Sequence, residues 1–102
     1  MVNLITSNIE GIKQLLAANM IEQAYVFGSA AKGDFDENSD VDFLVKFRTD
    51  LTPLEKGEFW WNLHDELRNF LKREIDIVTV NSLKNPYFIK EIDETKVLIY
   101  GE

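Results

Sequence analysis

The fold of this chain is decided by residues 24–47, which read AYVFGSAAKGDFDENSDVDFLVKF. The apolar run Ala24–Phe27 is stopped by Gly28, a pattern typical of a buried strand that enters a turn. After the polar stretch Lys32–Asp40, the residues Val41–Phe47 follow a second strand pattern. The sequence therefore predicts two strands joined by a glycine turn and a polar connection.

Helices are predicted on both sides of this stretch. Apolar residues recur at helical spacing between Ile9 and Met20. The clearest helix start is Thr52, because threonine can cap, Pro53 suits the first helical position, and Glu55 completes a capping box. One apolar face then continues to about Lys72.

Three further elements follow. Ile75–Val80 predicts a third strand and Pro86–Ile92 a short helix, and Val97–Tyr100 is a final apolar segment. Strands interleaved with helices predict an α+β (α/β-type) fold, with a small sheet of three to four strands flanked by helices. No repeat, linker or low-complexity tract divides the sequence, so residues 1–102 are expected to form a single domain.

The charge balance limits the partners that the chain can bind. The net charge is −7, from 18 acidic and 11 basic side chains. Such a surface repels the phosphates of DNA and RNA, so direct nucleic-acid binding is not expected. A single nucleoside triphosphate differs, because a divalent cation can neutralise its phosphates.

The cysteine content and the length of the apolar runs indicate where in the cell the protein is expected. The chain has no cysteine, which excludes a disulfide framework and a thiolate zinc site. The longest apolar runs are four residues, far shorter than a membrane span. We therefore expect a cytoplasmic protein without membrane association.

The turn Gly28–Gly33 is the first candidate for chemistry. Glycine permits positive φ and close backbone approach, and the small residues that follow leave room for a ligand. A helix that starts after the turn would direct N–H groups at a phosphate. Taken alone, the turn is better explained as a plain strand-to-helix connection, because Gly-Ser is common in turns.

Asp40 and Asp42 are the second candidate. In a strand, side chains two residues apart lie on one face, with Cα atoms roughly 6.5 Å apart. Two such carboxylates repel each other unless a cation lies between them, and hard oxygen ligands suit Mg²⁺. The alternative is a solvated acidic edge.

Asp76 is the third candidate, because it interrupts the apolar strand Ile75–Val80. An isolated carboxylate in a buried strand is costly and needs a partner. A salt bridge to a basic side chain would serve. A metal shared with Asp40 and Asp42 would also serve, since neighbouring strands lie about 4.8 Å apart.

Together these features resemble the polymerase-beta-like nucleotidyltransferase superfamily. Gly28-Ser29, ten residues, and then Asp40-x-Asp42 match its signature, and the short length with a later Asp76 resembles its minimal nucleotidyltransferase branch. The resemblance covers about residues 8 to 100. It implies nucleotide-binding roles for Gly28, Ser29, Lys32 and Ser39, and catalytic and metal-binding roles for Asp40, Asp42 and Asp76. Family members often carry arginine where this chain has Lys32, which keeps the charge but loses bidentate geometry.

The resemblance also implies a reaction and a partner. Two Mg²⁺ ions would assist transfer of AMP from ATP to a hydroxyl group, with Asp76 helping to deprotonate the acceptor. Members of this branch are commonly paired with a HEPN-type toxin protein, so the chain would act as the antitoxin that adenylylates a tyrosine of this partner. Two alternatives remain: inhibition of the toxin by binding alone, and transfer to a small molecule, which usually takes an additional domain.

Overall fold

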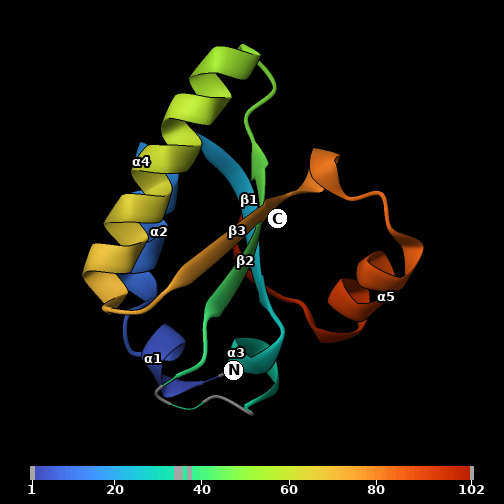
Figure 1. Cartoon of the computed structure of the whole chain (residues 1–102). Helices are drawn as coiled ribbons and strands as arrows, with labels where there is room; N and C mark the ends of the chain where they lie inside the picture. The colour runs from blue at the N-terminus through green and yellow to red at the C-terminus, as the bar shows by residue number, and fades with distance from the viewer. Residues whose placement is uncertain (1, 34–35, 37, 102) are drawn as a thin grey trace.

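Four strands form one mixed sheet at the centre of the molecule (Figure 1). The computed structural model describes residues 2–33, 36 and 38–101. The strands are β1 (Ile21–Phe27), β2 (Val41–Phe47), β3 (Ile75–Thr79) and β4 (Val97–Tyr100). Their order is β3-β2-β1-β4; β1 pairs antiparallel with β2 and β4, and β2 pairs parallel with β3. The predicted α+β class with a small mixed sheet is confirmed.

Helices cover both faces of this sheet. In Figure 1, α2 (Ile9–Ala18) and α4 (Pro53–Leu71) lie on one side of the sheet and α5 (Pro86–Thr95) lies on the other. Short helical turns complete the fold: α1 (Asn3–Thr6), α3 (Ser29–Lys32) and η1 (Val80–Ser82). None of the described helices is long and apolar enough to cross a membrane.

The capping box at Thr52 forms as the sequence predicts. Thr52 Oγ1 accepts from the Glu55 N–H at 3.2 Å, and Glu55 Oε1 accepts from the Thr52 N–H at 2.9 Å. Pro53 takes the first helical position. The helix ends at Lys72, whose φ of 58° is left-handed and cannot continue it.

The alternation along β2 separates the two apolar layers of the protein. Phe43 and Val45 belong to the main core, between the sheet and helices α2 and α4. Leu44 belongs to a smaller cluster with Phe27 and with Ile92 of α5. Because side chains alternate along a strand, Asp42 lies on the same face of the sheet as Leu44. That face is the one that α5 covers.

The ends of several elements differ from the sequence predictions. β1 begins at Ile21 rather than Ala24, and α5 extends to Thr95 rather than Ile92. The third strand ends at Thr79, because Val80 begins η1. The predicted polar stretch Lys32–Asp40 lies partly outside the described residues.

Candidate active site

Gly28 makes the turn after β1 and could not be replaced without strain. Its φ is 68° and its ψ is −145°, a combination that L side chains rarely adopt. A Cβ atom at this position would lie 2.7 Å from Asp42 Oδ2. The expected positive φ at Gly28 is therefore confirmed, and the group that lies close to this glycine is the Asp42 carboxylate.

Asp42 lies between this turn and the third predicted carboxylate. Its register partner on β1 is Phe27, directly before Gly28. Its register partner on the parallel strand β3 is Asp76. Asp40 lies two residues before Asp42, so the strand pairing brings Asp40, Asp42 and Asp76 to one end of the sheet.

The electrostatic environment of Asp42 reflects this crowding. Burial, followed by the negative charges of Asp76, Asp40 and Glu91, raises the pKa of the half-buried Asp42 from 3.8 to about 6. A raised pKa means that the ionised carboxylate is disfavoured. A cation beside Asp42 would counter that shift in pKa, because an opposite charge favours the ionised carboxylate.

Asp76 is exposed, which corrects one step of the sequence argument. The side chains on either side of it, Ile75 and Ile77, are buried in the main core, whereas Asp76 points to the opposite face. Burial in an apolar strand therefore does not force Asp76 to find a partner. Its position beside Asp42 comes from strand register alone.

The donor set suits a hard divalent cation. Mg²⁺ is usually held by one or two carboxylates, with water and substrate phosphate completing its shell. Within the described ranges, no group of three or more His, Cys, Asp and Glu side chains could by itself hold a metal ion. Mg²⁺ binding by Asp40, Asp42 and Asp76 therefore stays a prediction, and oxygens of a bound nucleotide or of water would have to complete the site.

The predicted nucleotide-binding residues differ in their surroundings. Ser29 begins α3, is half-buried, and its N–H has no acceptor one turn earlier in that helix. Lys32 is exposed in the last turn of α3. The Ser39 hydroxyl bonds to Asp36, accepting from its N–H at 3.0 Å and donating to Oδ1 at 3.2 Å. Nucleotide binding by these residues stays a prediction.

Helix α5 contributes two residues that the sequence analysis missed. Thr95 Oγ1 accepts from the Gly28 N–H at 3.2 Å and donates to the Glu91 carbonyl at 3.0 Å. Glu91 is exposed and adds to the negative charge around Asp42. Neither has a local signal, because only the packing of α5 on the sheet brings them to the site.

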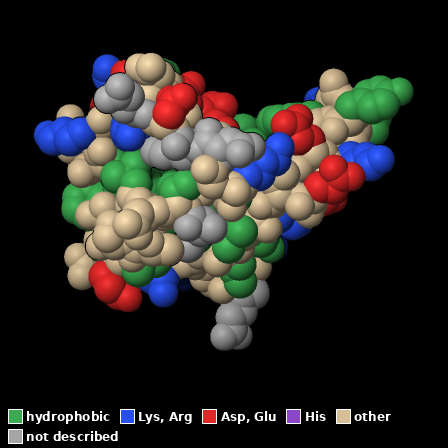
Figure 2. All heavy atoms as spheres, turned by 90° about the horizontal axis from the view of Figure 1, so that it is seen from below, with side chains coloured by type: hydrophobic (Ala, Val, Ile, Leu, Met, Phe, Trp, Pro, Cys, Tyr) green, Lys and Arg blue, Asp and Glu red, His purple; other side chains and the backbone are tan. Residues whose placement is uncertain are grey.

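Basic side chains border the site on the other side of Asp40. A cavity of about 550 Å³ there is lined by Asp40, Arg68, Lys72 and Arg73, among others. Arg68 pairs with Glu74 at 2.8 Å, and Arg73 donates to the Ser39 carbonyl at 3.3 Å. Figure 2 views the lower end of Figure 1 and shows acidic side chains gathered along one side, interspersed with Lys and Arg.

Comparisons with known proteins show the family of this chain. Residues 10–102 match the family described as "Polymerase beta, Nucleotidyltransferase". A Methanocaldococcus jannaschii protein named "Putative protein adenylyltransferase" is 31% identical over 87 residues, which is 85% of each chain. Among solved structures, a "putative minimal nucleotidyltransferase" superposes with a TM-score of 0.73 at 28% identity, covering 94% of this chain and 95% of the other.

A second solved structure has a partner and a nucleotide. It is described as a toxin-antitoxin crystal structure with AMP-PNP and has a TM-score of 0.73 at 25% identity. The match covers 93% of this chain and 74% of that one. The family match spans nearly the whole chain and includes the Gly28 turn and all three carboxylates. The chain belongs to the polymerase beta nucleotidyltransferase family and is a nucleotidyltransferase.

Proposed function

We propose that this protein transfers AMP from ATP to a tyrosine hydroxyl of a HEPN-type toxin and thereby acts as its antitoxin. The observation that carries the proposal is the position of Asp42. It lies in register with Asp76 on the neighbouring parallel strand, and Gly28 approaches it so closely that no side chain fits between them. A glycine turn therefore borders the carboxylates that would hold the metal.

The chain's own residues account for substrate binding. The Ser29 N–H and hydroxyl lie where the turn enters α3 and would bind phosphate oxygens, and Lys32 would add a positive charge. Bound Mg²⁺, held by Asp40, Asp42 and Asp76, would polarise the α-phosphate and stabilise the leaving oxygens. The exposure of Asp40 and Asp76 leaves their outer side open to an incoming acceptor.

In the proposed transfer, the acceptor hydroxyl oxygen attacks the α-phosphorus and forms a new P–O bond. The bond from the α-phosphorus to the oxygen bridging to the β-phosphate breaks, and pyrophosphate leaves with that electron pair. The hydroxyl proton passes to Asp76, which is exposed and beside Asp42.

Two similarities support a protein as the acceptor. One curated relative is named "Putative protein adenylyltransferase", and one structural neighbour is a toxin-antitoxin structure with AMP-PNP. The resemblance to the minimal nucleotidyltransferase branch, whose members are commonly paired with HEPN-type toxins, supports such a toxin as the partner. A cytoplasmic location and dependence on two Mg²⁺ ions belong to the same proposal.

The decisive experiment distinguishes catalysis from inhibition by binding. A HEPN-type toxin is mixed with wild type or with Asp40→Asn/Asp42→Asn in the presence of ATP and Mg²⁺, at a molar ratio of about one copy of either protein to twenty of the toxin. A covalent mark persists after dissociation, whereas a binding inhibitor must saturate its target. We expect a mass gain of one or more adenylyl groups and loss of toxin activity with wild type only.

The double variant is also the control for folding. It removes two neighbouring negative charges without changing side-chain size, so its circular dichroism should match wild type and its metal-free thermal stability should not fall. If wild type and the double variant both inhibit the toxin only near a one-to-one ratio, and the toxin mass does not change, the proposed transfer reaction is contradicted. Inhibition by binding alone is then favoured. Modification of an added aminoglycoside instead of the partner would contradict the acceptor class.

A further inference from the structure

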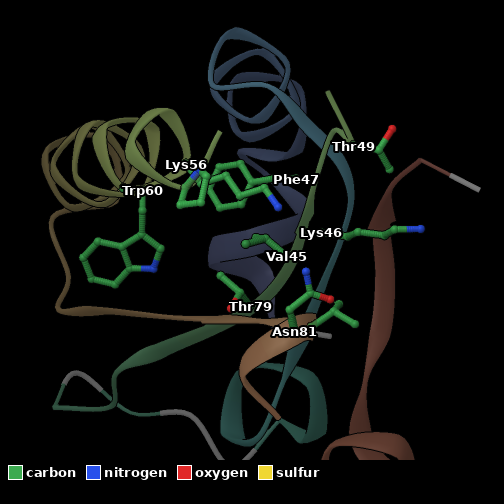
Figure 3. A pocket seen from close by; sticks show the side chains of 11 residues that line it. Val45, Lys46, Phe47, Thr49, Lys56, Trp60, Thr79 and Asn81 are labelled. Carbon is green, nitrogen blue, oxygen red and sulfur yellow. The ribbon is translucent and has the colours of Figure 1, made fainter. Parts of the chain in front are cut away.

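A second hollow lies at the other end of β2, away from the acidic site. It has a volume of about 430 Å³, within the range of small-molecule sites. Figure 3 shows Lys56 and Trp60 entering it from α4, and Thr79 and Asn81 from the opposite side. Val45 and Phe47 lie between them and form an apolar floor.

This cavity is separate from the nucleotidyltransferase site. Val45 and Phe47 belong to the core on the α2 and α4 face of the sheet, whereas Asp42 lies on the α5 face. Val45 is three positions beyond Asp42, which corresponds to about 10 Å along a strand. A ligand in this cavity would therefore not contact the three carboxylates.

Gly57 keeps one side of the cavity open. It lies within α4, where glycine weakens a helix relative to other residues. Its φ is not positive, and a Cβ at this position would meet no atom within 4 Å. Neither backbone conformation nor packing within the chain accounts for glycine here, but access to the cavity that it lines does.

Trp60 is held in place before any ligand arrives. Its indole N–H donates to the Ile77 carbonyl at 3.2 Å. Its ring stacks on His64 with centroids 5.4 Å apart and an interplanar angle of 8°. A fixed aromatic surface in a cavity wall favours a planar ligand, because no side-chain freedom is lost on binding.

The polar groups of the cavity favour an anion. Its eleven lining residues include two lysines and neither Asp nor Glu, in a chain of net charge −7. Lys46 points away from Trp60 in Figure 3 and pairs with Glu22 at 3.1 Å. Lys56 is half-buried and has no ion pair with any residue that the structure describes. In the same described part of the chain, the Asn81 side chain has no hydrogen-bond partner.

We propose that this cavity is a binding site for a small planar aromatic molecule with an anionic group. The ring lies against Trp60 and the apolar floor of Val45 and Phe47. The anion pairs with the Lys56 ammonium group and accepts from the Asn81 amide. The proposal does not depend on the transfer reaction.

A matched pair of probes tests both features of the ligand. Indole-3-acetate and tryptamine share a ring system but carry opposite charges. Each is titrated into ¹⁵N-labelled protein while the Gly57 and Asn81 amides and the Trp60 indole N–H are followed by NMR. We expect saturable shifts with indole-3-acetate, and about threefold to fivefold weaker binding of tryptamine, the contribution of one partly exposed ion pair.

Four variants locate the binding. Gly57→Leu, which should fold because leucine is the better helix former, should abolish saturable binding of indole-3-acetate. Lys56→Gln should remove the difference between the probes, whereas Lys84→Gln, an exposed lysine outside the cavity, should not. Asp42→Asn should bind like wild type, which keeps this test independent of the transfer reaction. Absence of saturation with indole-3-acetate, equal binding of tryptamine, or shifts unaffected by Gly57→Leu would overturn the proposal.

Discussion

The backbone N–H of Gly28 donates a hydrogen bond to Thr95 Oγ1 at 3.2 Å, although the two residues are 67 positions apart. The same hydroxyl donates to the Glu91 carbonyl, so its donor and acceptor roles are both used. Next to this contact, the Phe27 and Phe88 rings pack edge to face with centroids 6.0 Å apart. Helix α5 therefore fixes the position of the turn that borders the carboxylates.

Removal of this hydrogen bond should weaken nucleotide binding. Thr95→Val keeps the shape of the side chain but leaves the Gly28 N–H without its acceptor. An N–H group that loses its hydrogen-bond partner in this way costs about 1–2 kcal/mol of free energy. If the whole of this cost falls on binding, ATP affinity in the presence of Mg²⁺, measured by calorimetry, should fall by about fivefold to thirtyfold. Thr95→Ser retains the hydroxyl and should bind within about twofold of wild type. Equal affinities in all three proteins would mean that Thr95 does not position the turn.

Substitution of Gly28 should be far more damaging than substitution of Gly33. Both have positive φ, 68° and 96°, but only a Cβ at Gly28 would collide with another group, Asp42 Oδ2. Gly33→Ala should lower the free energy of unfolding by about 1 kcal/mol, the cost of the backbone conformation. Gly28→Ala should lower it by at least about 2 kcal/mol, since the contact is added to that cost. Urea denaturation measures both, and equal losses would contradict the close approach of Gly28 to Asp42.

The elements that the sequence predicts best have strong local signals. The Thr52 capping box and the apolar run Val41–Phe47 each depend on neighbouring residues only, and both appear with the predicted bounds. The start of β1 was missed because Glu22 and Gln23 break the apolar pattern, and there the strand is held by pairing with β2. The helices α1 and α3 have four residues each, which is too short for apolar residues to recur at helical spacing in the sequence.

Part of the candidate site could also be predicted, because some of its residues have a local signal in the sequence. Asp40 and Asp42 are only two positions apart, so their proximity can be predicted from the sequence. The neighbour of Asp42 on β3 depends on parallel register, and the burial inferred for Asp76 was wrong because the strand has one exposed face. Glu91 and Thr95 reach the site through the packing of α5, which no local pattern encodes.

The raised pKa of Asp42 should make metal-free stability depend on pH. The folded protein holds a proton on Asp42 up to about pH 6, whereas the unfolded chain releases it near 3.8. The folded state therefore binds more protons between these values, and the free energy of unfolding should fall as the pH rises from about 4 to about 6. The fall should be on the order of 1 kcal/mol, because a half-exposed carboxylate is screened by water.

Asp42→Asn supplies the reference for this measurement. It lacks the titrating group but keeps the side-chain shape, so the difference between the two unfolding curves isolates Asp42 from the other acids. Urea denaturation at several pH values, in buffer containing a chelator, gives both curves. Parallel curves for wild type and Asp42→Asn would show that the pKa of Asp42 is not raised.

The charges that raise this pKa can be ranked by substitution. Asp76 contributes more than Asp40, and Asp40 more than Glu91. Asp76→Asn should therefore lower the pKa of Asp42 the most, Asp40→Asn less, and Glu91→Gln the least, because each removes one neighbouring negative charge. The ¹³C shift of the Asp42 carboxyl group, followed through a pH titration, reports each value directly. Glu94→Gln is the matched control, since Glu94 lies on the same helix but faces Lys90, 3.9 Å away. An unchanged pKa of Asp42 in Asp76→Asn would contradict the placement of Asp76 beside Asp42 by the pairing of β2 with β3. An equal effect of Glu91→Gln and Glu94→Gln on that pKa would contradict a contribution of α5 to the site.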